Sequence, residues 1–235
     1  IASAASLGAV LGAQLIHSPL FGSGILAFIF SLLGLMILAL WLKNSFRNST
    51  EVLLAGVVAG FFFSSLATLV RALSDPATWS SNMVWLMGSL GHLSFSDSLL
   101  VALLLLFCAV LSWLHWKPLD LISIDETSAE SAGVDVEMIR RRIFIITSLI
   151  TAICVSAAGV IGFLGLIVPH FLRKVGLRSH YHLIPATFLY GAGLLLCSDV
   201  FARTIARPSE LPVGVITAII GAPVFLVLAR KTQRQ

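Results

Sequence analysis

Long apolar runs, separated by short polar segments, occupy most of this 235-residue chain. They are found at residues 24–42, 52–73, 99–116, 143–158, 183–200 and 213–228. Their lengths are close to the roughly 20 residues that a helix needs to cross a bilayer. Only 11% of the residues are charged and the mean hydropathy is +1.00, whereas a soluble domain of this size needs far more charge to cover its surface. The sequence therefore predicts an all-α fold, a bundle of transmembrane helices.

The first 16 residues, IASAASLGAVLGAQLI, are rich in alanine, serine and glycine. Such small residues are common where membrane helices pack closely. The stretch begins without an initiator methionine, a cytoplasmic tail or a signal-peptide pattern. We therefore expect it to be a helix of a longer protein whose earlier part is absent. Together with the short segment described next, it brings the number of predicted membrane segments to eight, all in one domain, 1–235.

Residues 159–178, GVIGFLGLIVPHFLRKVGLR, begin as apolar sequence, meet a Pro-His pair and end in three cations. The apolar part, 162–170, is too short for a complete span. We predict a short or broken helix, which a bilayer tolerates only where protein or a water-filled cavity surrounds it. This segment is therefore a candidate part of a transport pathway, with the residues Gly162, Gly165, Pro169 and His170.

The positions of the cations predict which ends of the spans face the cytoplasm. Of the 15 Lys and Arg residues, twelve fall on one side, in the segments 43–47, 117–142, 173–178 and 230–234. Three fall on the other side: Arg71, Arg203 and Arg207. The segment 117–142 and the carboxyl end are therefore predicted to be cytoplasmic. Between two spans, residues 76–92 contain Trp79 and Trp85 and predict an amphipathic helix along the membrane surface.

The segment 117–142 holds six of the eleven acidic residues. Its part ISIDETSAESAGVDVEMIRRR predicts two short helices, with Asp125 as an N-cap and Gly133 as the break between them. A polar helix pair of this kind suits docking on a soluble partner, and a solvated loop of mixed charge is the alternative. The chain contains no GxxxxGK[ST] run, so any ATP hydrolysis must be carried out by another chain.

Several long motifs resemble the carboxyl half of FecCD-type permeases, the membrane subunits of ABC importers for iron-siderophores, haem and cobalamin. These motifs are GVIGFLGLIVPHFLR, LLCSDVFAR and ELPVGVITAIIGAPVFLVL, and STEVLLAGVVAG and IDETSAESAGV fit the same pattern. The resemblance covers nearly the whole chain. It implies a type II ABC importer permease of the bacterial inner membrane, with about ten spans in the family, the first two of which would be missing here.

The resemblance also implies partners. These are an ABC ATPase, which carries the ATP and Mg, a periplasmic substrate-binding protein, and a second permease copy that forms a homodimer with a shared pathway. Membrane lipid surrounds such a protein, and the chain itself would hold no cofactor. No nucleic-acid partner is expected, because the cations lie beside membrane spans. The expected substrate is an iron-siderophore or haem, or else cobalamin, and an oxyanion such as molybdate is the alternative.

The family pattern assigns roles to three further groups of residues. Coupling to the ATPase falls on Asp125, Glu126, Ser128, Ala129 and Gly133. A gate at the cytoplasmic end of the pathway falls on Asn48, Ser49 and Thr50. The alternative for this loop is a plain helix cap, with Ser49 or Thr50 accepting a backbone hydrogen bond, and both can hold at once. Docking of the binding protein falls on Arg203, with Arg207 assisting. The alternative there is an intrahelical pair between Arg203 and Asp199, four residues away.

Other functional classes fit the sequence less well. An ion-coupled secondary transporter places ionisable residues near the middle of its spans, and here the spans are nearly free of them. The six histidines lack the HExxH or comparable spacing of a metal site, and no GxSxG motif indicates a hydrolase. A purely structural membrane subunit is disfavoured by the broken segment at Pro169 and by the glycine-rich last span.

Overall fold

A computed structural model describes residues 1–15, 19–42, 46, 48–74, 87–91, 93–205 and 211–232. These residues form α-helices and connecting segments and contain no β-strand, which confirms the all-α prediction. The helices are α1 (Ala2–Leu15), α2 (Pro19–Trp41), α3 (Ser49–Ala72), α5 (Phe95–Trp113), α6 (Trp116–Ile124), α7 (Glu126–Ser131), α8 (Val136–Ala158), α9 (Leu164–Lys174), α10 (His180–Ile205) and α11 (Val213–Thr232).

Five of these helices are long and apolar enough to cross a membrane: α2, α3, α5, α8 and α10. The other three predicted membrane segments are also helical, but their described apolar parts are shorter than a span of about 20 residues. Helix α1 has 14 residues and α9 has 11, and the apolar part of α11 is Val213–Val224. The chain therefore combines complete spans with the short helix α9, which needs protein around it, while α11 runs for 20 residues in all.

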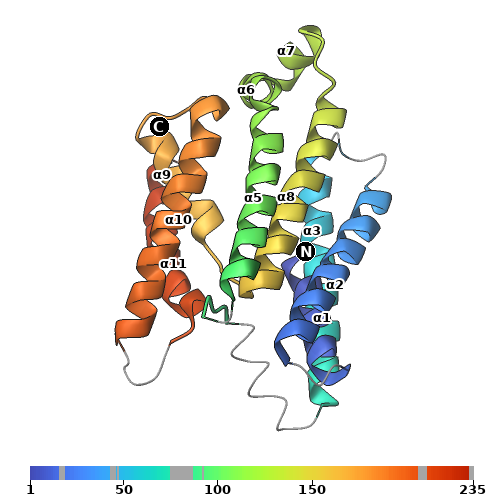
Figure 1. Cartoon of the computed structure of the whole chain (residues 1–235). Coiled ribbons are helices and arrows are strands. Elements are labelled where there is room, and N and C mark those ends of the chain that lie inside the picture. The colour runs from blue at the N-terminus through green and yellow to red at the C-terminus, as the bar shows by residue number, and fades with distance from the viewer. Residues whose placement is uncertain are drawn as a thin grey trace.

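Helices α6 and α7 project from one end of the bundle, which we call the α6–α7 end (Figure 1). The carboxyl ends of α2, α9 and α11 and the amino ends of α3 and α10 lie at this same end (Figure 1). These helix ends flank the cation-rich segments 43–47 and 230–234, and the segments 117–142 and 173–178 lie at this end of the bundle, as the orientation prediction requires. Which side of the membrane this end faces stays a prediction.

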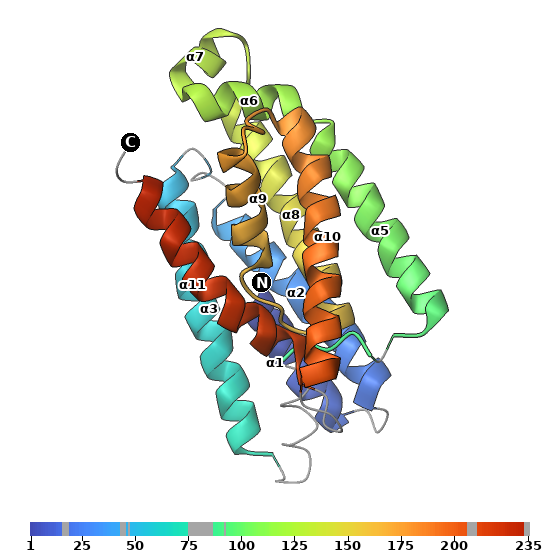
Figure 2. The same cartoon turned by 90° about the vertical axis from the view of Figure 1, so that its left-hand side faces the viewer.

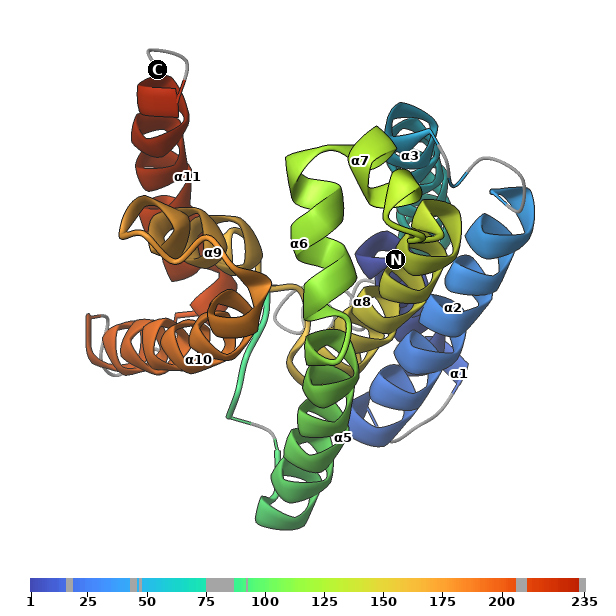
Figure 3. The ribbon, with the colours of Figure 1, turned by 90° about the horizontal axis from the view of Figure 1, so that it is seen from above.

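The helices form two groups. In the first group α1, α2, α3 and α8 pack together, and α5 packs on α8. The second group consists of α9, α10 and α11. Seen from the α6–α7 end, the second group stands apart from the first, and α6 lies on the side of the first group that faces it (Figure 3). Helix α10 packs against both α5 and α6, so these two helices connect the groups.

Small residues hold the first group together. Ala4, Ala5 and Ala9 of α1 are buried against α2, α3 and α8. Because a methyl side chain lets two helix backbones approach closely, the contact gains dispersion energy without a bulky side chain between the helices. The sequence-based expectation of close packing by the first helix is confirmed.

Helix α8 begins earlier than the sequence predicted. The second of the two predicted short helices is the first part of α8, which runs unbroken from Val136 into the apolar run at 143–158. The Asp135 side chain accepts a hydrogen bond of 2.9 Å from the Met138 backbone and caps this helix. The arginines that follow are good helix formers, so nothing interrupts the helix before the membrane segment. The two short helices at this end are instead α6 and α7.

The short helix predicted around Pro169 is present as α9, which extends from inside the bundle to the α6–α7 end (Figure 2). The break lies before this helix and not at the proline. Helix α8 ends at Gly159, whose φ is +73°, and α9 begins after Phe163, whose φ is +67°. Pro169 lies inside α9, where it removes one backbone donor but leaves the helix continuous to Lys174.

At the end opposite α6 and α7, backbone hydrogen bonds join the two helix groups through residues 87–89. Ser89 N donates to the Ala158 carbonyl at the end of α8, at 3.0 Å. Gly214 N, at the start of α11, donates to the Met87 carbonyl at 3.1 Å. A Cβ at Gly214 would lie 2.2 Å from that same carbonyl oxygen, so only glycine permits this approach. Trp79, Trp85 and most of the amphipathic helix predicted at 76–92 lie outside the described residues.

Candidate functional site

The amino end of α7 is capped by Asp125, as the sequence predicted. Asp125 Oδ2 accepts hydrogen bonds from the Ser128 backbone at 2.9 Å and from Ser128 Oγ at 2.8 Å, and it also accepts one from Thr127 Oγ1. The hydroxyl of Thr127 and the two groups of Ser128 together lower the pKa of Asp125 from 3.8 to about 2. The cap therefore carries a full negative charge at neutral pH, at a helix end that favours it.

The carboxyl end of α7 closes at Gly133, the predicted break. Val134 N donates to the Ala129 carbonyl at 3.0 Å and Gly133 N donates to the Glu130 carbonyl at 2.9 Å. This pair of bonds is a Schellman motif, which requires the left-handed backbone that Gly133 adopts with φ +84°. No atom in the described part of the chain lies within 4 Å of a Cβ placed there. The turn therefore faces open space.

Contacts with the bundle fix the position of α7. The Ala129 side chain is fully buried, and Glu126 forms an ion pair with Arg140 of α8. Glu126 is 46% exposed, so solvent screens this pair and it orients α7 more than it stabilises it. Ile124, the last residue of α6, is 81% exposed. The segment thus presents a polar surface with one prominent apolar side chain, which the sequence analysis did not single out.

The predicted gate residues lie at the start of α3. Asn48 is the N-cap: its Oδ1 accepts a hydrogen bond of 3.1 Å from Thr50 N, and its Nδ2 donates to Glu51 Oε1 at 2.9 Å. The helix cap is therefore present, but the capping residue is Asn48 and not Ser49 or Thr50, because the Asn48 side chain accepts the hydrogen bond from the free N–H group of Thr50. Thr50 is exposed, and the Ser49 side chain lies outside the part that the structure describes.

The predicted docking residue Arg203 lies at the end opposite α6 and α7. Its Nε donates to Asp199 Oδ2 at 2.8 Å, which confirms the pairing along α10. The Arg203 side chain is 40% exposed while that of Asp199 is 15% exposed, so the arginine is the more accessible partner of the pair. Arg203 also lies beside the 87–91 segment, with Nη2 at 3.7 Å from a Cβ placed on Gly91. Arg207 lies outside the described residues.

The predicted pathway residues lie before and within α9. Gly162 belongs to the break and Gly165 to the first turn of the helix, and no described atom lies within 4 Å of a Cβ at either position. His170 follows Pro169, and its Nε2 atom is buried without a hydrogen-bond partner among the described residues. Open glycines and an unsatisfied imidazole nitrogen distinguish this segment from an ordinary packed helix.

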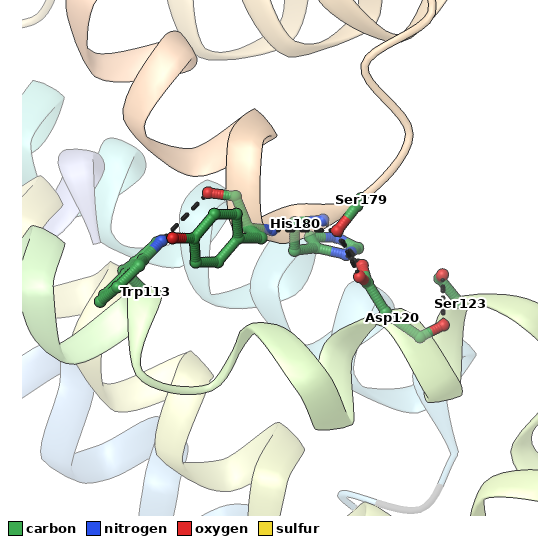
Figure 4. A network of polar contacts seen from close by, with 6 residues as sticks. Trp113, Asp120, Ser123, Ser179 and His180 are labelled. Carbon is green, nitrogen blue, oxygen red and sulfur yellow. Dashed lines mark hydrogen bonds and ion pairs between the residues drawn. The ribbon is translucent and has the colours of Figure 1, made fainter.

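A polar cluster that the sequence analysis missed joins α6 to α10 (Figure 4). Asp120 of α6 accepts hydrogen bonds from Ser179 Oγ at 2.6 Å and from His180 N at 2.7 Å, and His180 Nδ1 lies 2.5 Å from Asp120 Oδ1. Burial raises the pKa of Asp120, but these bonds and the charge of His180 outweigh it, and the net pKa is lowered. No spacing rule links residues 60 positions apart, so only the fold reveals the cluster.

An apolar hollow of about 380 Å³ lies between α10 and α11, and none of its lining residues belongs to the predicted pathway segment. It is lined by Phe201, Ile205, Leu211, Ile216, Ile219 and Ile220. These side chains offer no hydrogen-bond donor or acceptor that could orient a polar ligand. We assign no role in transport to this hollow.

The sequence model of the FecCD transport family matches residues 1–231 of the chain. The chain belongs to the FecCD transport family. This confirms the resemblance seen in its motifs and makes the chain a transport protein. With five helices able to span a membrane, this FecCD protein is a multi-pass inner-membrane protein, as predicted.

Relatives of known identity match nearly the whole FecCD chain. It is 35% identical over 230 residues to the vitamin B12 import system permease protein BtuC of Klebsiella pneumoniae subsp. pneumoniae, covering 94% of this chain and 69% of the relative. The corresponding permease of Salmonella paratyphi A is 36% identical over 232 residues, covering 95% and 70%.

A solved structure supports the fold. A chain of a metal-chelate type ABC transporter in an inward-facing conformation superposes with a TM-score of 0.88 at 30% identity. The match covers 97% of the FecCD chain and 73% of that chain. The bundle is therefore that of an ABC permease, as the sequence predicted.

Proposed function

We propose that this chain is the permease subunit of an ABC importer that carries a metal chelate, with cobalamin as the favoured substrate, into a bacterial cell. The observation that carries the proposal is the 35–36% identity to vitamin B12 permeases across almost the whole chain. The similarity to a metal-chelate transporter supports the same class of substrate. It also keeps iron-siderophores and haem as the second candidates, which reverses the order expected from the sequence.

The projecting segment of α6 and α7 would dock on an ATPase chain, which would hold the ATP and Mg. Three features favour this role. The segment projects from one end of the bundle (Figure 1), the two ends of α7 are fixed by Asp125 and Gly133, and Ile124 is exposed beside them. A soluble partner gains affinity from an apolar side chain inside a polar rim. The residues proposed to mediate coupling are Asp125, Glu126, Ser128, Ala129 and Gly133.

A second copy of the chain would complete the pathway as a homodimer. Helix α3, which begins at the proposed gate residues Asn48, Ser49 and Thr50, and α11 lie on the side away from α5, and α9, which follows the break, packs beside α11 (Figure 3). Helix α3 leaves large apolar side chains exposed along its length. A partner copy on that side would enclose a mostly apolar route lined by the segment at Gly162, Gly165, Pro169 and His170.

A periplasmic binding protein would dock at the opposite end of the bundle. The partly exposed side chain of Arg203 supports this role, and Arg207 would assist it. Exposed charges at the rim of an interface raise the association rate and set the orientation more than they raise the affinity. The expected counterpart is therefore a carboxylate on the binding protein.

The test is uptake into proteoliposomes that contain the permease and its ATPase, with the binding protein outside and ATP inside. Radiolabelled cobalamin should accumulate only with ATP, and a ferric siderophore, haem and molybdate serve as competing substrates. Accumulation of molybdate or of a ferric siderophore instead of cobalamin would overturn the substrate. Uptake that needs an ion gradient but no ATP would overturn the ABC importer and support a secondary transporter.

A further inference from the structure

Asp120, Ser179 and His180 occupy the junction where α6 meets the first turn of α10. Both oxygens of the Asp120 carboxylate are used, one by Ser179 Oγ at 2.6 Å and the other by the backbone and ring nitrogens of His180. The first backbone N–H groups of a helix have no partner within the helix, and its amino end favours negative charge. Here a different helix supplies the cap, so the bonds that begin α10 are also bonds between two helices.

The junction is partly shielded from water. The side chain of Asp120 is 26% exposed and that of His180 is 14% exposed. Hydrogen bonds to a charged group are stronger than neutral ones, and a lower local dielectric strengthens them further. Solvent therefore screens this cluster less than it screens the ion pair of Glu126 on α7.

Aromatic contacts reinforce the same junction. Trp113 Nε1, at the end of α5, donates to the Tyr181 carbonyl at 3.0 Å (Figure 4). The Tyr181 ring lies 5.2 Å from the Trp113 ring and 5.1 Å from the Trp116 ring, centroid to centroid. The start of α10 is therefore held on two sides, by a polar contact to α6 and by aromatic contacts at the α5–α6 corner.

The junction lies on the route between the proposed ATPase contact and the second helix group. Helix α7 follows α6 after a single residue, and α10 packs against α9 and α11. At the opposite end, the two groups are joined by the backbone bonds of residues 87–89. A displacement of α7 therefore reaches α10 through α6, provided that α6 and α10 stay together.

We propose that Asp120, Ser179 and His180 form a latch that keeps α6 attached to α10 throughout transport, so that a movement of α6 and α7 displaces α9, α10 and α11 as one body. The latch rests on the proposed function, because it transmits the movement that the ATPase would cause. Asp120 is a positioning residue in this scheme. It contacts neither the substrate nor ATP, and it acts by holding α10 to the coupling helices.

The first test replaces Asp120 by asparagine, which keeps the size of the side chain and removes its charge. In proteoliposomes, uptake per ATP hydrolysed should fall about tenfold, the factor that corresponds to losing one hydrogen bond to a charged group. ATP hydrolysis and the affinity for the ATPase should stay near the parent values. Asp97→Asn is the matched control, because Asp97 makes a similar bond to Ser94 at the opposite end of α5, and its uptake per ATP should not change. Unchanged uptake per ATP in Asp120→Asn would overturn the latch.

The second test replaces the polar latch by a covalent one. Asp120→Cys and Ser179→Cys are combined in a protein whose native Cys108, Cys154 and Cys197 are replaced by alanine. With both thiols reduced, uptake per ATP should be as low as in Asp120→Asn. After oxidation to a disulfide, it should return to near the value of the cysteine-free parent. Loss of uptake on oxidation would mean that α6 and α10 must separate during the cycle, which overturns the latch.

The two proposals fail in different ways. If the parent protein binds no ATPase and shows no ATP-driven uptake, the proposed function is wrong, and the latch proposal is overturned as well. If the parent transports normally while Asp120→Asn and the reduced double-cysteine protein also give parent values, only the latch is wrong. Since the disulfide compares one protein in two redox states, a folding defect in the single variant leaves the latch testable.

Discussion

Gly133 is the residue whose backbone conformation most directly shapes the proposed coupling surface. Its φ of +84° costs a residue with a Cβ about 1–2 kcal/mol, even though the space around it is open in the described part of the chain. We expect Gly133→Val to shift the end of α7, to weaken ATPase binding and to lower substrate-stimulated ATP hydrolysis. The measurement is ATPase affinity and stimulated hydrolysis in the reconstituted complex.

Asparagine provides the control at this position. Asparagine tolerates the left-handed region better than a β-branched residue, so Gly133→Asn should have the smaller effect on both measurements. Stimulated hydrolysis at the parent rate in Gly133→Val would remove this turn from the coupling surface.

The pKa of Asp125 predicts how the capping of α7 depends on pH. Its pKa in the folded protein is about 2, below the ordinary value of 3.8, so its capping contribution is complete above 3.8 and disappears as the pH falls toward 2. Near neutral pH Asp125 stays charged, so its titration should not alter amide hydrogen exchange in residues 126–134. Asp125→Ala should speed that exchange near neutral pH, because the cap is lost. Asp125→Asn, which can still cap, should exchange more slowly than the alanine variant, and equal exchange in the two would contradict the role of the cap.

At the scale of a single helix, α10 carries the latch at one end and the proposed docking arginine at the other. Arg203→Glu places a carboxylate opposite the one expected on the binding protein, and it also repels Asp199. We expect about a tenfold loss of binding-protein affinity at low salt, with less difference at high salt because the interaction is screened. Basal ATP hydrolysis should not change, since the substitution is at the far end of the bundle.

Asp199→Asn tests whether the intrahelical pair with Arg203, and not docking itself, controls binding-protein affinity. It removes a neighbour worth only a few tenths of a kcal/mol, so binding-protein affinity should stay close to the parent value. Affinity is measured by titrating the binding protein onto the reconstituted permease at two salt concentrations. Parent-like affinity of Arg203→Glu at low salt would leave Arg203 as half of a structural pair.

For the whole molecule, the distribution of cations predicts the orientation in the membrane. Single cysteines at Lys117 and Arg178 should be protected from a membrane-impermeant thiol reagent in spheroplasts, and one at Arg207 should react. The background protein lacks Cys108, Cys154 and Cys197, so that each signal has one source. Labelling at position 117 in intact spheroplasts would reverse the topology, and permeabilised cells provide the positive control for all three positions.

The sequence by itself determined the class of fold and the local endings of several helices. Apolar runs of span length predict membrane helices because the bilayer leaves the backbone no other way to satisfy its hydrogen bonds. The cap at Asp125 and the turn at Gly133 were equally predictable, because each depends on groups within about five residues of one another. The pairing of Asp199 with Arg203 was predictable for the same reason, since one turn of helix separates them.

Only the tertiary structure decided which distant segments meet. The second predicted short helix is continuous with the span in α8, and the interruption before α9 lies at 159–163 and not at Pro169, because packing against neighbouring helices outweighs weak local preferences. The bonds between Asp120 and His180 join residues 60 positions apart, and Gly214 is required by a carbonyl from Met87. Such contacts depend on the relative placement of whole helices, and no periodicity or spacing along the chain encodes that placement.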